Sequence, residues 1–442
     1  MTQMLIRATI ADIINDGDSS PGLSGPHLSI IEDGGLLITN GRIVARGEFM
    51  AVRAAGPDVP VTDWRGGYVL PGFVDTHVHL PQMPVLGRLG WSLLEWLEKA
   101  ALPEEARMAN VAHALAEATR FVDALTSHGT TTASVFGAHF APAVASLFEV
   151  AHRAGIRVAT GLVVSDRHLR DDLHVSPDDA YRDSTALIRQ FHERGRLLYS
   201  VTPRFALSTT EAMLEVCQTL LTEHPRVRLQ THVNEQRAEI EEVARLFPWA
   251  PDYVSVYERH GLTGPRSIMA HDVHVTTSEL EQLAASGTSV AHCPASNAAL
   301  GSGIFPLRRH RDAGVHVALG TDVGGGTGFG VMKEALQAYL MQRVAAEAVV
   351  LTPADLLYLS TLAGAEALGL DNEIGNFEPG KAADFVYLDP PPASVLAEVC
   401  DRSEDLTHTL AALFTLAGQE SIAEVRVQGR IVYQRPVVHD AA

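Results

Sequence analysis

The sequence predicts an α/β protein in which a closed (β/α)8 TIM barrel carries a small β-sandwich domain built from both chain termini. The chain has 442 residues, more than the ~250 of a typical barrel, so a second unit is expected beside it. Strand-like and helical segments alternate in the middle of the chain, whereas both ends read as strands and turns. We expect residues 1–67 and 371–442 to form the small domain and residues 68–370 the catalytic barrel.

The terminal segments share a β-strand pattern. Near the N-terminus, LLITNGRIVARG places Asn40 and Gly41 between alternating apolar residues, which predicts a two-residue hairpin of type I′. Similar patterns return at 381–389 (KAADFVYLD) and 424–434 (EVRVQGRIVYQ). One small sheet domain assembled from both ends accounts for these patterns.

The middle of the chain repeats a strand-then-helix unit. Repeated βα units predict a parallel sheet, and ~300 residues suit a closed barrel, with an open doubly wound sheet as the structural alternative. The glycine cluster in GTDVGGGTG lacks the spacing and the lysine of a phosphate-binding loop, so we interpret it as a loop after a strand. The strand-like runs are 68–80, 129–137, 156–164, 197–205, 227–235, 267–275, 288–296 and 315–323.

Charge and cysteine content narrow the classes of partner and compartment. With 34 Lys+Arg against 53 Asp+Glu, the net charge of −19 would repel phosphate backbones and anionic lipids, so neither nucleic acid nor a membrane is expected as a partner. The N-terminus lacks the apolar core of a secretory signal, and no run reaches ~18 apolar residues. Three widely spaced cysteines, Cys217, Cys293 and Cys400, argue against a disulfide framework. A cytoplasmic protein is expected.

Histidine and aspartate residues mark the ends of several predicted strands. His77 and His79 lie two residues apart on one strand, so both imidazoles point to the same face. His232, His271 and Asp322 close three later runs. Taken singly, the last three are typical of buried histidines and of a helix N-cap. Because the carboxyl ends of barrel strands surround one cleft, the whole set predicts a metal site.

Imidazole and carboxylate ligands suit one Zn²⁺ per chain, with Fe²⁺ as the alternative. We assign His77, His79, His232 and Asp322 to the metal, while His271 faces the bound water. A two-metal site commonly needs a carboxylated lysine on a middle strand. The chain has only three lysines, with none between residues 99 and 333, so a mononuclear site is expected.

Glu235 lies three residues beyond His232. A carboxylate at this position can take a proton from the attacking water and pass it to the substrate. The alternative interpretation is a glutamate at the start of the next helix, where the helix dipole favours it. The expected catalytic residues are therefore Glu235, His271 and Asp322.

Several motifs, PGFVDTHVH, HVNE, MAHDVHV, AHCPASN and GTDVGGG, resemble the amidohydrolase superfamily over nearly the whole chain. IGNFEPGKAADFVYLD is similar to the return of that family to its small β domain. More narrowly, DTHVHLPQ, LLEWLEKAALPEE, TPRFA and TSVAHCPASN resemble the guanine-deaminating members of its ATZ/TRZ-like branch.

This resemblance implies a metal-dependent aminohydrolase of purine catabolism that converts guanine to xanthine and ammonia, and a homodimer. It also implies that Gln82, Arg204 and Phe205 bind the substrate. The chemistry agrees, because a guanidinium, an aromatic face and an amide suit a planar base with a polar edge. The alternatives are another heterocycle, such as a pterin, a triazine or an oxidised purine, and a metal-free scaffold. The segment from Trp91 to Trp96 is interpreted as an amphipathic core helix, with a lid as the alternative.

Overall fold

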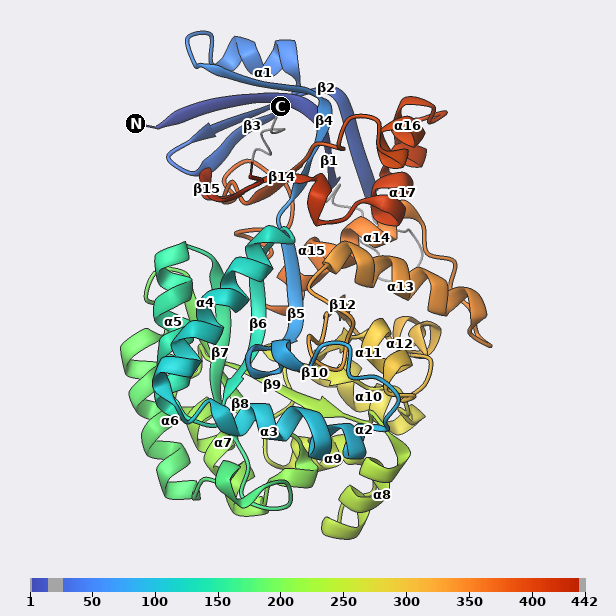
Figure 1. The fold of residues 1–442 in the computed structure, drawn as a ribbon. Coiled ribbons are helices and arrows are strands. Elements are labelled where there is room, and N and C mark those ends of the chain that lie inside the picture. The colour runs from blue at the N-terminus through green and yellow to red at the C-terminus, as the bar shows by residue number, and fades with distance from the viewer. Residues whose placement is uncertain (1, 15–26, 437–442) are drawn as a thin grey trace, which may run out of the picture.

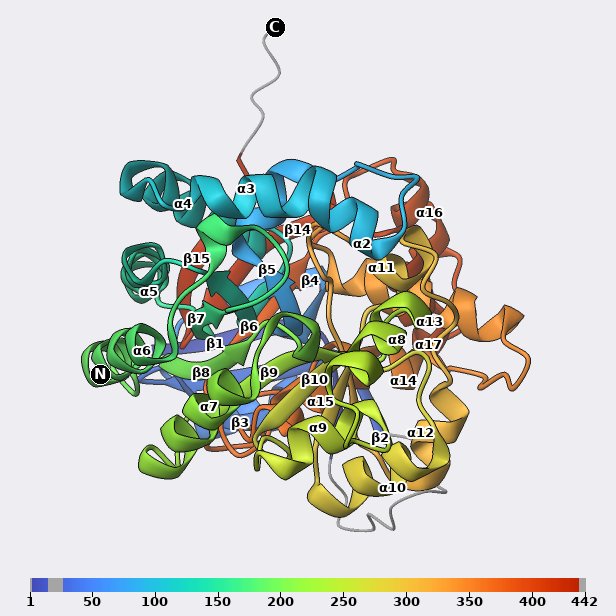
Figure 2. The ribbon, with the colours of Figure 1, turned by 90° about the horizontal axis from the view of Figure 1, so that it is seen from below.

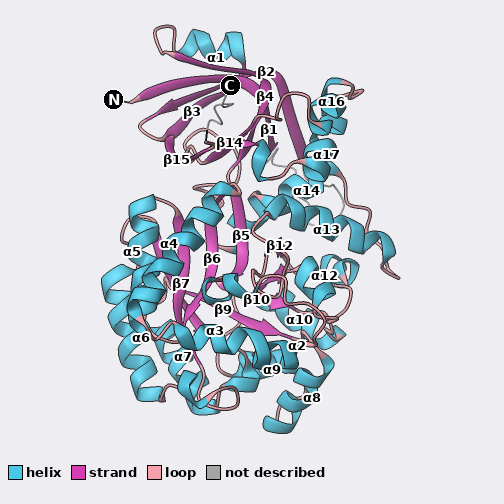
Figure 3. Ribbon diagram, viewed as in Figure 1, coloured by secondary structure: helices cyan, strands magenta, loops and turns pink. Residues whose placement is uncertain are grey.

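The computed structural model describes residues 2–14 and 27–436, which form two sheets and the helices around them (Figures 1 and 3). Seven strands from both ends of the chain make one mixed sheet: β1 (Gln3–Ile14), β2 (His27–Thr39), β3 (Arg42–Glu48), β4 (Val61–Pro71), β13 (Phe385–Leu388), β14 (Ile422–Val427) and β15 (Arg430–Gln434). Their order is β15-β14-β13-β4-β1-β2-β3. The small β domain expected from both termini is confirmed.

The predicted hairpin joins β2 to β3. Thr39 pairs with Arg42, and the two residues between them, Asn40 and Gly41, have φ values of 51° and 77°. Positive φ at both central positions defines the type I′ turn, whose twist matches that of antiparallel strands.

Eight parallel strands form the barrel, in chain order around the sheet. Every residue of these strands is buried, which explains why they read as continuous apolar runs. They are β5 (Phe73–His79), β6 (Thr130–Ala138), β7 (Arg157–Val164), β8 (Leu197–Pro203), β9 (Arg228–Val233), β10 (Ser267–His271), β11 (Ser289–His292) and β12 (Val317–Leu319).

The barrel closes between its first strand and the segment after its last. Thr76 Oγ1 donates to the Leu319 carbonyl over 2.7 Å, and the backbone nitrogen of Asp322 donates to the His77 carbonyl over 2.8 Å. The buried carboxylate of Asp75 accepts from the backbone nitrogen of Thr321 over 3.0 Å. These bonds fix Asp322 beside His77, and the predicted closed barrel is confirmed.

One predicted run, 68–80, is divided between the two sheets. β4 ends at Pro71 in the small sheet, and β5 begins at Phe73 in the barrel. A Cβ atom at Gly72, between them, would come within 2.2 Å of Thr131 Oγ1. The chain therefore passes from one sheet to the other through a position where only glycine fits.

Helices surround the barrel, and a few pack beside the small sheet (Figures 1 and 3). The longer ones are α4 (Val111–Ser127), α5 (Ala141–Ala154), α6 (Pro177–Phe191), α7 (Glu211–Glu223), α8 (Arg237–Leu246), α10 (Thr277–Ser286), α13 (Val331–Val344), α14 (Pro353–Ser360) and α17 (Leu406–Leu416). The shorter ones are α1 (Phe49–Ala55), α2 (Leu93–Trp96), α3 (Leu102–Arg107), α9 (Tyr253–Arg259), α11 (Pro294–Ala299), α12 (Leu307–Ala313), α15 (Leu362–Ala367) and α16 (Val395–Asp401). A π-helical turn, η2 (Leu97–Ala101), joins α2 to α3, and the 3₁₀ turns are η1 (Leu80–Val85), η3 (Asp171–Leu173), η4 (Ala206–Ser208) and η5 (Gln419–Ser421).

The carboxyl ends of the barrel strands face away from the small sheet. Figure 2 looks onto this end, with α2, α3 and α8 in front. Within the described part of the chain, none of the helices has the length and apolar character needed to cross a bilayer.

Candidate active site and metal centre

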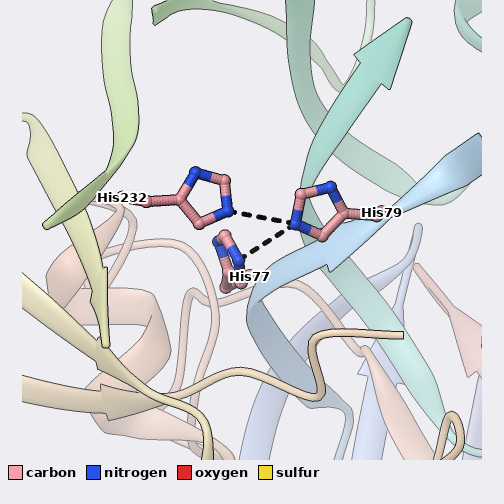
Figure 4. A group of neighbouring side chains, drawn as sticks. All are labelled: His77, His79 and His232. Atoms are coloured by element: carbon pink, nitrogen blue, oxygen red, sulfur yellow. Dashed lines mark hydrogen bonds between the residues drawn. The ribbon is translucent and has the colours of Figure 1, made fainter. Parts of the chain in front are cut away.

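Three imidazoles converge at the carboxyl ends of β5 and β9 (Figure 4). The Nε2 atoms of His77 and His79 lie 3.2 Å apart, and His232 Nε2 lies 3.3 Å from His79 Nε2. All three side chains are buried. The alternation of side chains along a strand thus brings His77 and His79 to one point, as the spacing predicts.

Asp322 adds an oxygen to this group. Its Oδ1 atom lies 3.3 Å from His77 Nε2 and 3.2 Å from His79 Nε2. Asp322 has a φ of 47°, in the left-handed region that is uncommon outside glycine. Its backbone bond to His77 holds it in this strained conformation, which is typical of functional sites.

The protonation states of these groups suit metal binding. Burial lowers the pKa of His77 to about 3 and that of His232 well below its usual value. Burial alone would raise the pKa of Asp322, but hydrogen bonds with His77 and His79 hold it well below its usual value. Neutral imidazoles and ionised carboxylates are the forms that bind metal ions. The Nδ1 atom of His232 lies 2.6 Å from the Arg204 carbonyl oxygen, an acceptor that directs the Nε2 lone pair toward the other ligands.

His271 lies beside this group, on the side of Glu235. Its Nε2 atom is 3.5 Å from Glu235 Oε2 and 3.9 Å from Asp322 Oδ2. Its Nδ1 atom is held 2.9 Å from Asn297 Oδ1. Burial would lower the pKa of His271, but the charges of Glu235 and Asp322 raise it. His271 also forms a possible metal group with His77 and Asp322, so position alone allows it to be a ligand.

Glu235 is buried between β9 and α8. Its Oε1 atom accepts a hydrogen bond from Ser302 Oγ over 3.2 Å. Burial raises the pKa of Glu235 to about 7, where a carboxyl group both takes and releases protons near neutral pH. The alternative role at the start of α8 belongs to Glu239, whose carboxylate accepts from the backbone nitrogens of Glu235 and Gln236. The side chain of Glu235 is therefore not needed to cap the helix.

A cavity of about 20 Å³ adjoins these residues, enough for about one water molecule. Gln82, Arg204 and Phe205, expected as substrate contacts, line it, and each is at most 3% exposed. The cavity is also lined by His79, Leu93, Trp96, Leu97, His232, Glu235, His271, Leu300 and Asp322. A purine can enter only after part of this wall moves.

The wall toward solvent is formed by α2 and the residues around Leu300. Leu93 and Trp96 of α2 face the cavity. Gln236 ties the two parts together, because its Oε1 accepts from the Leu93 nitrogen over 3.2 Å and its Nε2 donates to the Leu300 carbonyl over 2.7 Å. An open pocket of about 730 Å³, lined by Trp91 and Ser302 among others, lies on the other side of this wall.

Two polar residues beside the cavity were not expected from the sequence. Glu105, on α3, accepts hydrogen bonds from Gln82 and Arg204, and His139 follows β6 directly and lies 3.2 Å from Glu105. His139 occupies a strand end, the same position as the predicted ligands, so that signal could have identified it. Glu105 is harder to identify from the sequence, because Glu104 precedes it. The two glutamates differ only in the face of α3 on which they lie.

Known proteins resemble this chain in both sequence and fold. The sequence model of the Amidohydrolase family matches residues 68–432. A probable guanine deaminase of Deinococcus radiodurans is 54% identical over 94% of this chain and 96% of its own length. The structure of Escherichia coli guanine deaminase superposes with a TM-score of 0.92 at 37% identity, covering 99% of this chain and all of the other. An adenosine deaminase of Xanthomonas campestris with bound zinc has a TM-score of 0.80 at 25% identity, over 97% and 92% of the two chains.

Proposed function

The chain belongs to the amidohydrolase family, and from this we propose that it is a hydrolytic deaminase that converts guanine to xanthine and ammonia with one Zn²⁺ per chain. The observation that carries the proposal is the position of Glu235 and His271 beside four potential ligands, on the wall shared with Gln82, Arg204 and Phe205. A protein with these groups in one cavity has both the proton-transfer residues and the base-recognition residues that the reaction needs. The relatives named as guanine deaminases support the choice of guanine.

The distances between the ligand atoms fit one tetrahedral ion. With Zn–N bonds of about 2.0–2.1 Å, tetrahedral ligands stand about 3.3 Å apart. Four of the six distances among His77 Nε2, His79 Nε2, His232 Nε2 and Asp322 Oδ1 are 3.2–3.3 Å. His271 lies farther out, beside Glu235, which supports these four as the ligands. Fe²⁺ accepts the same donor set and is the alternative ion.

When bound, the ion supplies Lewis acidity, which makes a water molecule acidic enough to attack at neutral pH. Glu235 accepts the proton released by the attacking water and delivers it to the ring nitrogen next to the carbon that carries the amine. His271, fixed by Asn297, stabilises the negative charge that develops on the oxygen. Asp322 accepts the second proton, from the hydroxyl group of the adduct, and passes it to the amine, so that the C–N bond breaks, ammonia leaves and the carbonyl of xanthine forms.

Gln82, Arg204 and Phe205 are proposed to hold the base. Arg204 and Gln82 provide buried polar groups, and Phe205 an apolar face, on one wall of the cavity. Buried polar groups of this kind reject analogues that leave them unpaired. Entry of guanine requires displacement of α2 from Leu300, which opens the cavity into the 730 Å³ pocket.

We propose that the protein acts in purine catabolism, in the cytoplasm, as a homodimer. Cysteines without disulfide partners, two of them buried, fit a reducing compartment. Light scattering on the purified protein measures the mass of the assembly, and a monomer at micromolar concentration would contradict the dimer.

Ammonia release from guanine tests the proposed function. The zinc-loaded protein should release ammonia and form xanthine, and a sample treated with chelator should do so only after zinc is restored. A protein that holds one zinc per chain and leaves guanine unchanged would contradict guanine as substrate. The same preparation would then be tested with pterins and triazines.

A further inference from the structure

Glu105 is the centre of a buried polar cluster at the cavity wall. It comes from α3 and is 2% exposed. Its Oε1 atom accepts from Gln82 Nε2 and from Arg204 Nη1, each over 2.8 Å. Its Oε2 atom lies 2.9 Å from Arg204 Nη1 and 3.2 Å from His139 Nε2. Three side chains from different parts of the chain are thus fixed by one carboxylate.

The bond to Gln82 decides which end of its amide is available to a ligand. An amide group has one accepting end and one donating end, and an ionised carboxylate only accepts. Burial alone would raise the pKa of Glu105, but the charge of Arg204 and hydrogen bonds from His139 and Gln82 hold it well below its usual range. The Gln82 nitrogen must therefore face Glu105. The oxygen lies toward Gly324, where a Cβ atom would come within 2.3 Å of it, and it accepts no hydrogen bond from the residues that the structure describes.

The same carboxylate sets the donors of Arg204. Nη1 is occupied by Glu105, while the buried Nε atom has no hydrogen-bond partner within the described residues. Arg204 also lines the cavity and lies over the Phe205 ring, 5.9 Å from its centroid. Gln82 and Arg204 share one oxygen of Glu105 and both line the cavity, so one carboxylate fixes the amide and the guanidinium on the same wall.

We infer that Glu105 is a positioning residue that determines substrate specificity, by presenting the Gln82 oxygen as an acceptor beside the donors of Arg204. This pair is complementary to an N–H next to a carbonyl group, the lactam edge of guanine. A base with an unprotonated ring nitrogen at that edge would place two acceptors face to face. The inference deepens the proposed function and rests on it, since it assumes that a purine occupies the cavity.

Guanine and 2-aminopurine are the pair of probes that tests this role. Both carry the amine on the same ring carbon, but 2-aminopurine lacks the lactam N–H and the carbonyl. In Glu105→Met, the side chain keeps a similar length but offers no strong acceptor, so neither end of the Gln82 amide is fixed. The Gln82 nitrogen can then turn toward the substrate, and Arg204 loses the partner of its Nη1 atom. We expect kcat/KM for guanine to fall about 10- to 100-fold, the range for a buried unmatched hydrogen bond, with metal content unchanged.

The ratio of kcat/KM for guanine to that for 2-aminopurine separates positioning from a merely structural role. Glu105→Met should lower this ratio at least tenfold, whereas general damage would lower both rates equally. The exchanged pair Glu105→Gln with Gln82→Glu restores a carboxylate that accepts from the new amide, and should keep most of the ratio. Glu104→Met is the matched control, because Glu104 pairs with Arg107 at the surface and should change neither rate. An unchanged ratio in a folded Glu105→Met protein would overturn the inference.

Two further measurements cover the other outcomes. If Glu105→Met does not fold, Gln82→Met removes the acceptor and leaves the bonds of Glu105 to Arg204 and His139. This variant should lower the same ratio, and an unchanged ratio there would overturn the inference. If the wild-type protein releases no ammonia from guanine, the proposed function fails by itself. The fluorescence of 2-aminopurine then reports binding directly, and competition by guanine gives the binding ratio. Stronger binding of guanine that is lost in Glu105→Met would still support the role of Glu105, and equal binding ratios in the wild-type and variant proteins would refute it.

Discussion

Replacing Glu235 with glutamine should abolish proton transfer while leaving the site intact. The amide is nearly the same size as the carboxyl group, and its oxygen can still accept from Ser302 Oγ, which lies 3.2 Å from Glu235 Oε1. None of the four proposed metal ligands uses Glu235, so the metal content should stay near that of the wild type. The folding stability should also change little, because Glu239 caps α8.

The expected fall in kcat is large because none of the described residues around the cavity can replace Glu235 as the base. General acid–base catalysis is worth about 10²- to 10⁴-fold, or about 2.7–5.4 kcal/mol at 1.36 kcal/mol per tenfold. Asp322 Oδ1 is held between His77 and His79, and Glu239 accepts from two backbone nitrogens and from Tyr253. Neither can take over the whole task, so we expect kcat to fall at least ~10²-fold and toward the upper end of this range.

The assay is ammonia release at saturating guanine, with metal content measured on the same samples by mass spectrometry. Glu241→Gln is the control, since Glu241 lies on the exposed side of the same helix. A Glu235→Gln protein with one metal per chain and kcat within tenfold of the wild type would refute the role of Glu235. A variant that had lost its metal would instead show that Glu235 supports the ligands.

Three other changes test separate parts of the site. His77→Ala should lose both metal and activity, because it removes one of four converging ligand atoms, and a fully metallated active variant would contradict the assignment. Arg204→Ala should raise KM for guanine, and unchanged guanine kinetics would show that Arg204 does not recognise the base. The same variant should lower the free energy of unfolding in urea by about 3–5 kcal/mol, because the buried carboxylate of Glu105 loses its cation. Gln236→Ala should release Leu93 and speed exchange of small ligands measured by stopped flow, and an unchanged rate would show that α2 is not held by this bond.

Much of the barrel could be predicted because its strands are buried on both faces. Such strands lack polar alternation and stand out as apolar runs between helices. The same property concealed the boundary at Gly72, since β4 and β5 are both apolar where they meet. Only the close approach of Thr131, more than fifty residues away, reveals why the run breaks there.

The candidate ligands could be predicted for a different reason. Their positions follow from topology, because the carboxyl ends of the parallel strands surround one cleft, and this arrangement does not depend on which side chains the strand ends carry. His232 is the last residue but one of β9, His271 ends β10, and Asp322 follows β12 closely. Their separate tasks could not be read in this way, since the difference between ligand and neighbour depends on distances of 3.2–3.9 Å between atoms of distant segments.

Glu105 escaped prediction because its partners lie 23, 34 and 99 residues away in the sequence. A signal was present nevertheless. Leu97 and Ala101 are buried, and Glu105 follows them at spacings of eight and four residues, so it falls on the apolar face of a helical segment. A carboxylate in such a stripe must have partners, because an unpaired buried charge is too costly. Glu104, one residue earlier, faces outward and pairs with Arg107.

Arg204 connects the metal centre to the recognition wall through different atoms. Its backbone carbonyl is the acceptor for His232 Nδ1, and its side chain binds Glu105. Truncating the side chain leaves that carbonyl in place, so the orientation of His232 should survive in Arg204→Ala. Metal binding and substrate recognition are therefore expected to separate in this variant: KM for guanine rises while the zinc content stays at one per chain. Loss of both together would mean that the side chain of Arg204, through Glu105, also fixes the backbone that orients His232.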